Sequence, residues 1–171
     1  VAVGTFLERL GPPGLDVLCG KALSPNYEAV HTRRVFFIRN EFWLIEDSLN
    51  GELPHRYDLR FHLTPSVWNQ CSVVKTERNC IVRTPDVALL FSKEADPIIE
   101  PSWFSPQYGI KHSAPCVSVV SENTASATFY TLIFPLCLRA ALPGFSVRKH
   151  TSNTVVEVGH NNGTSEILSW D

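Results

Sequence analysis

One segment of nine residues constrains the fold of this chain more than any other. In the run from 55 to 63, HRYDLRFHL, apolar and aromatic side chains alternate with charged and polar ones. Successive side chains of a β-strand point to opposite faces, so the pattern predicts a strand with one face on a core. The core-facing set is His55, Tyr57, Leu59, Phe61 and Leu63, and the outward set is Arg56, Asp58, Arg60 and His62.

The rest of the chain has the same short-strand character. Turn-competent residues separate the segments at Arg39-Asn40, Asn50-Gly51, Asn123-Thr124, Pro143-Gly144 and Asn161-Asn162-Gly163. The 12 prolines recur along the chain and forbid long helices in most places. Strands are expected at 15–19, 28–38, 41–48, 55–63, 72–75, 79–83, 87–92, 109–111, 115–121, 126–134, 145–149, 154–159 and 164–170. These elements predict an all-β fold, an antiparallel β-sandwich of many short strands in a single domain spanning 1–171.

Two stretches are expected to lack strands. Residues 1–14 begin apolar and end in a Gly-Pro-Pro-Gly loop signal. The segment 93–109 holds three prolines and three aromatic residues without periodicity, which favours an ordered loop packed on something else. Between Val30 and Pro65 we expect three short strands joined by two tight turns.

The overall charge excludes some classes of function. Charged residues make up 19% of the chain and the net charge is −2, which is untypical of a protein that coats nucleic acid. Affinity for a polyanion must therefore come from a local patch. The longest apolar run, Phe129–Leu138, is too short to span a membrane. Because the chain lacks methionine and opens on VAVGTFLERL, we expect it to be a piece of a longer protein.

A local cationic patch is predicted on the outward face of the 55–63 strand. Arg56, Arg60 and His62 would project side by side there, and His31 and Arg33 share one face of a neighbouring strand. Guanidinium groups bind carboxylates and sulfates in a bidentate manner. The alternative is a solvated sheet face on which Asp58 pairs with the arginines.

Other chemistry is weakly signalled. The six histidines form no metal-binding spacing, and no nucleophile elbow or glycine-rich phosphate loop is present, so no catalytic residue is assigned. The five cysteines form no C-x-x-C pair; Cys71 and Cys80 could close a short loop, but unpaired thiols are favoured. Trp103 and Tyr108 could stack on sugar rings or pack against another domain.

The order of several segments resembles a known family. The runs VHTRRVFF, FWLIEDSL, HRYDLRFHLTP, SWFSPQYGIK, APCV and ATFYTLIFP are similar to the C-terminal β-domain of heparinase II/III-like polysaccharide lyases. The resemblance covers roughly 15–136. It implies a larger enzyme, a carbon–oxygen lyase, in which an N-terminal helical toroid and this β-sandwich form the cleft. Such enzymes cleave uronic-acid polysaccharides by β-elimination, using a tyrosine and a histidine for proton transfer.

The resemblance also sets expectations for sites and partners. The family's toroid residues and its Ala-His-Asn-Thr segment have no counterpart here, so the isolated chain is expected to be inactive. Arg56, Arg60, His62, Trp103 and Tyr108 are the candidate substrate-binding residues, with an acidic polysaccharide and the N-terminal helical domain as partners. His31 looks like a histidine that holds structural zinc in some members, but zinc wants about four ligands, so we expect no tight zinc in the isolated chain. The parent would be periplasmic or secreted, and the sequence leaves this open. The competing hypothesis is a stand-alone, non-catalytic carbohydrate-binding or structural β-domain.

Overall fold

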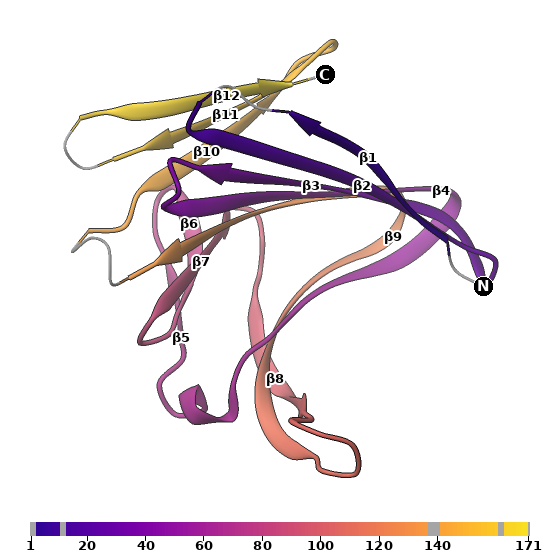
Figure 1. The fold of residues 1–171 in the computed structure, drawn as a ribbon, viewed down its shortest axis with the longest axis vertical. Helices are drawn as coiled ribbons and strands as arrows, with labels where there is room; N and C mark the ends of the chain where they lie inside the picture. Colours follow the sequence, from indigo (N-terminus) through magenta and orange to yellow (C-terminus); the bar gives the residue numbers. More distant parts are fainter. Residues whose placement is uncertain (1–2, 11–12, 137–140, 161–162, 171) are drawn as a thin grey trace.

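The computed structural model describes residues 3–10, 13–136, 141–160 and 163–170, and most of them lie in β-strands (Figure 1). One short 3-10 helix, η1 (Pro65–Val67), follows the fourth strand. No helix among the described residues is long and apolar enough to cross a membrane. The strands are β1 (Val3–Leu10), β2 (Leu15–Ser24), β3 (Tyr27–Ile38), β4 (Phe42–His62), β5 (Ser72–Lys75), β6 (Asn79–Arg83), β7 (Val87–Ser92), β8 (Ile98–Phe104), β9 (His112–Pro135), β10 (Gly144–Lys149), β11 (Thr154–Gly159) and β12 (Ser165–Trp170).

The strands form two antiparallel sheets. The large sheet has the order β1-β2-β3-β4-β9-β7-β6-β5, and β8 adds to a second part of β9. The small sheet has the order β10-β11-β12. In Figure 1 the small sheet lies over the face of the large sheet formed by its first strands. The all-β sandwich predicted from the strand pattern is confirmed.

A first core fills the space between the two sheets. Phe36, Leu44 and Leu132 of the large sheet pack there with Val156 and Val158 of the small one. These side chains alternate with ones that point to the other face, as strand geometry requires. Burial of this apolar surface stabilises the small sheet on the large one.

A second core lies on the opposite face of the large sheet. The strands β4 and β9 bend, so that Leu59 and Val117 from their far halves pack onto Leu89 and Phe91 of β7. Figure 1 shows both long strands sweeping away from the small sheet. We call the side of the large sheet that carries this second core the inner face, and the side toward the small sheet the outer face.

The alternation predicted for 55–63 is confirmed. Tyr57 and Leu59 are buried, whereas Arg56, Asp58 and Arg60 are exposed. The predicted turn at Arg39-Asn40 is also confirmed. Both residues have positive φ, 52° and 57°, which gives a tight hairpin the twist it needs.

The prediction of three short strands between Val30 and Pro65 is wrong, because β4 runs through Asn50-Gly51 without a hairpin turn. The pairing with β9 is interrupted instead between Asn50 and His55. The Glu28 carboxylate accepts the backbone N–H groups of Glu52 and Leu53 at 2.7 and 2.9 Å, so the displaced segment keeps its hydrogen bonds without a turn.

The turn predicted at Asn123-Thr124 is likewise replaced by an irregularity. The strand β9 passes through it, with Asn123 at φ 53°. The residues with turn chemistry therefore mark bulges that bend β4 and β9, because a bulge bends the strand that carries it.

Three further predictions are corrected. The segment 93–109 contains the strand β8, and the strand expected at 109–111 is absent, since Ile110 closes a turn onto Gln107 instead. Residues 3–10 form β1, which pairs with β2 although no strand was predicted there. The favoured prediction of unpaired thiols is confirmed for the four described cysteines, Cys19, Cys71, Cys80 and Cys116. Cys137 and the turn residues Asn161 and Asn162 lie outside the described residues.

Candidate functional site

A compact charged cluster lies on the inner face, where β3 pairs with β4. Arg33 donates to both carboxylate oxygens of Asp47, from Nε at 2.6 Å and from Nη2 at 3.0 Å. The His31 Nε2 lies 2.6 Å from Asp47 Oδ1. Register explains the contact, since Arg33 stands directly opposite Asp47. Bidentate contacts of this kind are directional and hold the guanidinium in one orientation.

The carboxylate of this cluster is buried and its partners are not. The Asp47 side chain is 2% exposed, whereas His31 and Arg33 are 31% and 44% exposed. Burial opposes ionisation of Asp47, but hydrogen bonds from His31 and Arg33 outweigh it and lower the pKa of Asp47 below its usual range. Asp47 therefore presents two partly exposed basic side chains from a fixed anchor.

An apolar surface adjoins this cluster on the same strands. Phe37 and Trp43 stack with ring centroids 4.9 Å apart and planes at 10°. They line, with Leu18 and Val35, a hollow of about 320 Å³. By strand alternation these side chains share the inner face with Arg33 and Asp47. The inner face thus combines oriented basic groups with a flat aromatic surface.

The predicted cationic patch lies on the outer side of β4, and its charges are largely compensated. Arg56 pairs with Asp58 at 3.1 Å and with Glu122 at 2.8 Å. Arg60 pairs with Glu100 of β8 at 3.0 Å. An anionic ligand would have to compete with these carboxylates for the guanidinium groups.

His62 lies on the same outer side as those arginines. Its Nδ1 is 3.3 Å from the Ser102 hydroxyl. It follows Arg60 by two residues, so the two side chains point to the same face of β4. The three candidate residues of this strand are therefore neighbours, but they do not share a face with His31.

The two aromatic candidates lie on the hairpin formed by β8 and β9, which extends away from the small sheet in Figure 1. Trp103 is 57% exposed, and the Lys111 ammonium lies 3.9 Å from the centre of its ring. Tyr108, in the connection between the strands, is fully exposed. Trp103 with Lys111 offers an aromatic face and a cation together, which suits an acidic sugar.

The described residues do not form a complete metal site. No group of three His, Cys, Asp or Glu side chains within the described ranges is placed to hold a metal ion. His31 has Asp47 as a possible co-ligand, but Arg33 already occupies both oxygens of that carboxylate. Zinc requires about four ligands, so these residues do not fit a closed zinc site.

The cluster around Asp47 was only partly visible in the sequence. His31 and Arg33 were recognised as sharing a face, but Asp47, which orients both, was missed. Its signal would have been a carboxylate at the strand position facing Arg33, on an otherwise apolar face of the strand. Asp47 can be placed opposite Arg33 only once the Arg39-Asn40 turn has set the register of the two strands.

Comparisons with known proteins agree with this fold. The model of the family "Heparinase II/III-like, C-terminal" matches residues 21–168. A heparinase III gene product aligns with a TM-score of 0.73 at 18% identity, over 98% of this chain and 27% of the other. The heparan sulfate lyase HepC from Pedobacter heparinus aligns with a TM-score of 0.72 at 18% identity, over 98% and 28%. Another heparinase III gives 0.74 at 15% identity, over 98% and 27%.

These figures set the scope of the likeness. At such identities the solved structures share the fold, and this chain spans little more than a quarter of their length. A comparison with curated proteins found no match.

Proposed function

The chain belongs to the heparinase II/III-like C-terminal family, and from this we propose that it is the β-domain of a polysaccharide lyase that cleaves uronic-acid polysaccharides by β-elimination. In this proposal an N-terminal helical domain of the same longer protein supplies the other wall of the cleft. The solved heparinase III structures that share this fold are more than three times as long as the chain, which supports a larger parent.

The proposed reaction has a defined electronic demand. A base removes the proton from the carbon next to the uronate carboxylate, and that electron pair forms a double bond to the neighbouring carbon as the bond to the 4-oxygen breaks. The leaving oxygen then takes a proton from an acid. Negative charge develops on the carboxylate side, so fixed positive groups near it lower the barrier. We assign neither the base nor the acid to this chain.

One observation supports a role for this chain in that reaction. The buried Asp47 carboxylate holds the partly exposed His31 and Arg33 on the inner face. A guanidinium and an imidazole that are oriented before substrate arrives suit a developing oxyanion, because no reorganisation is needed in the transition state. Beside them, the Phe37–Trp43 stack gives a flat apolar surface of the kind that sugar rings contact.

Variants of the longer protein test this role. His31→Ala is expected to lower kcat/KM on a uronate polymer at least tenfold, since a charge-assisted hydrogen bond is worth roughly 1.5–3 kcal/mol. Arg60→Ala is expected to raise KM more modestly, because Glu100 already engages this arginine. Lys75→Gln removes an exposed charge paired with Asp96 and serves as the control. If His31→Ala and Arg60→Ala both leave turnover and metal content unchanged, the proposed site is wrong.

Zinc enters the proposal only through ligands outside the described residues. We propose that His31 contributes to a zinc site solely in the longer protein, and that the isolated chain binds no tight zinc. Metal analysis of the purified chain is expected to show less than one equivalent after dialysis. One tightly held zinc per chain would contradict this.

Carbohydrate binding without catalysis is the second candidate, and it is favoured by Trp103 with Lys111 over its ring. It predicts measurable affinity of the isolated chain for uronate oligosaccharides, weakening with added salt and with Arg60→Ala. The lyase proposal instead predicts that catalysis appears only together with the helical domain.

A further inference from the structure

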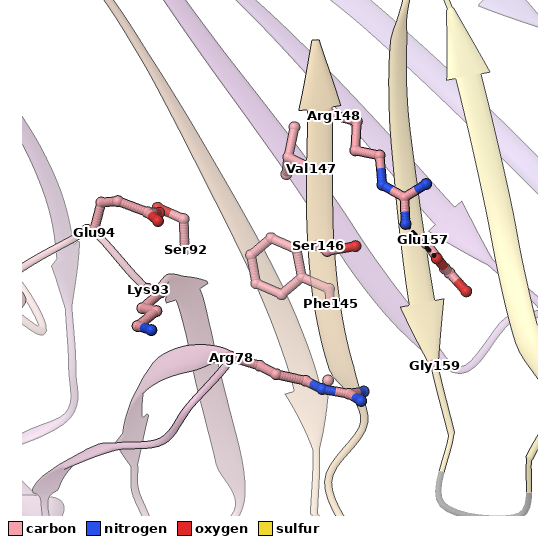
Figure 2. A pocket seen from close by; sticks show the side chains of 11 residues that line it. Arg78, Ser92, Lys93, Glu94, Phe145, Ser146, Val147, Arg148, Glu157 and Gly159 are labelled. Atoms are coloured by element: carbon pink, nitrogen blue, oxygen red, sulfur yellow. Dashed lines mark ion pairs between the residues drawn. The ribbon is translucent and has the colours of Figure 1, made fainter.

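A cleft opens where the edge of the small sheet meets the β6–β7 end of the large sheet (Figure 2). Its volume is about 450 Å³. One wall is formed by the end of β7 at Ser92 with Lys93 and Glu94, which follow it, and the other by β10 together with Glu157 and Gly159 of β11. A second hollow of about 590 Å³ adjoins it, since Arg78, Gly144 and Gly159 line both, and we call the two together the groove.

A buried side chain beside the cleft, which lines the second hollow, ties the two walls together. Asn79 is 2% exposed and donates from Nδ2 to the carbonyls of Phe91 and Phe145, at 3.1 and 3.0 Å. Its Oδ1 accepts the Phe145 N–H at 3.1 Å. The spacing of the two walls is therefore set by three buried hydrogen bonds and does not depend on a ligand.

Gly144 leaves room for the Arg78 side chain where the two hollows meet. A Cβ at Gly144 would stand 3.4 Å from Arg78 Cδ and 3.6 Å from Asn79 Oδ1. The Arg78 stem thus rests against the backbone at the start of β10, as Figure 2 shows. In this position Arg78 lines both hollows.

The cleft is lined by more cationic than anionic side chains. Arg78 and Lys93 form no ion pair within the described part of the chain, whereas Arg148 lies 3.7 Å from Glu157. Glu94 also lines the cleft. Two cations that lack a carboxylate partner among the described residues, on a preformed groove, favour an anionic ligand.

Neutral hydrogen-bonding groups accompany these cations. Ser92 and Ser146 place hydroxyl groups on the two walls. Within the described sheets β10 has a partner strand on one side only, and on its other edge the backbone groups of Phe145 bond to Asn79. Hydroxyl-rich, acidic chains need this combination of donors, acceptors and cations.

We propose that this cleft is a saccharide-binding subsite that holds a carboxylate or sulfate group of an acidic polysaccharide between Arg78 and Lys93. The saccharide identity rests on the proposed function, while the anionic character rests on the cleft itself. The cleft adjoins the outer side of the large sheet, whereas the Asp47 cluster lies on the inner face. This subsite would therefore bind the polysaccharide at a distance from the proposed reaction site. Its role is retention of long chains.

Binding to the 171-residue chain, followed by amide chemical shifts, tests the proposal. The probes are an unsulfated uronate oligosaccharide, a sulfated heparan-type oligosaccharide and a neutral oligosaccharide of equal length. We expect the acidic probes to shift the amides of Gly144 and Ser146, and the neutral probe to leave them unchanged. Whichever acidic probe binds more tightly identifies carboxylate or sulfate as the preferred group.

Matched charge variants give the decisive comparison. Arg78→Gln with Lys93→Gln is expected to weaken binding about tenfold, and Lys75→Gln with Arg83→Gln, which removes the same charge elsewhere, to change it less than twofold. Lys93→Glu alone, at an exposed position, repeats the test without disturbing the Arg78 packing. Unchanged affinity in the cleft variants, or equal loss in the control pair, overturns the proposal.

Turnover separates this inference from the proposed function. In the longer protein the cleft pair is expected to raise KM for long polymers and to leave cleavage of short oligosaccharides unchanged. A longer protein that cleaves no uronate polymer would defeat the lyase proposal, while cleft binding in the 171-residue chain would still stand.

Discussion

Asn79 of β6 and Phe145 of β10 join the two sheets through a reciprocal pair of hydrogen bonds, from Phe145 N to Asn79 Oδ1 and from Asn79 Nδ2 to Phe145 O. The pair is buried, and a third bond reaches Phe91 O. A side chain thus does what a strand partner would otherwise do at the edge of β10. The sandwich and the groove beside it depend on the same residue.

Asn79→Ala is expected to lower the free energy of unfolding by about 2–4 kcal/mol, because it leaves several buried backbone groups unpaired. Urea denaturation measures the loss. Asn153→Ala removes a single exposed bond to Ser169 and is expected to cost about 0.5 kcal/mol or less. Equal losses in the two variants would mean that Asn79 does not join the sheets.

Asp47→Asn is expected to destabilise the chain by about 2–3 kcal/mol, since it removes the anchor of two basic side chains while keeping the shape. Asp58→Asn, whose partner Arg56 is exposed, is expected to cost under about 0.5 kcal/mol. Thermal unfolding compares the two at neutral pH. A harmless Asp47→Asn would show that the inner-face cluster is not held by this carboxylate.

The contribution of Glu28 to the stability of the fold is expected to depend on pH in the acid range. Hydrogen bonds from the backbone of Glu52 and Leu53, and then from His55, lower the pKa of Glu28 from 4.5 to about 2. A carboxylate with a lowered folded-state pKa stabilises the fold above its unfolded pKa and loses that effect as pH falls. The stability difference between the wild type and Glu28→Gln should therefore be full above pH 4.5 and fade toward pH 2. A difference that stays constant across this range would contradict the account.

Gly51→Ala tests the irregular segment of β4. An added Cβ would stand 3.0 Å from His55 Cδ2 and 3.1 Å from both Glu28 Oε1 and the Tyr57 hydroxyl. We expect a loss of about 1–3 kcal/mol from overpacking. Gly4→Ala meets nothing within 4 Å and should change stability by less than about 0.5 kcal/mol. Chemical denaturation of both variants provides the measurement.

The sequence contained the fold class and the inward and outward faces of the 55–63 strand, because alternation is a local property of a strand. It did not reveal that β4 and β9 are continuous. Asn50-Gly51 and Asn123-Thr124 have turn chemistry, and what keeps the first of them in a strand is the Glu28 carboxylate, more than twenty residues away.

The strand β8 was not predicted, because its amino-acid composition is untypical of a strand. Pro101 stands opposite Pro115 in its pairing with β9. Proline is tolerated on an edge strand because no partner on its free side needs the missing N–H. An aromatic, proline-rich segment therefore resembles a loop until the neighbouring strand is known.

The site was predicted in pieces that the fold separates. His31 and Arg33 share the inner face with Asp47, whereas Arg56, Arg60 and His62 lie on the outer side of β4. Strand alternation predicted which residues of one strand share a face. It could not predict that the two sets lie on opposite faces of the sheet, because the connection between their segments was predicted wrongly. The acidic partners Glu100 and Glu122 come from β8 and β9, so charge compensation of the arginines required the tertiary structure.

The most direct test of the central claim is the ultraviolet absorbance of unsaturated uronate products. We predict that a longer protein containing this chain and a helical domain generates that absorbance from a uronic-acid polysaccharide, and that the 171-residue chain alone does not. No unsaturated product from the longer protein on heparan sulfate, alginate or related polymers, or its formation by the isolated chain, would contradict the account.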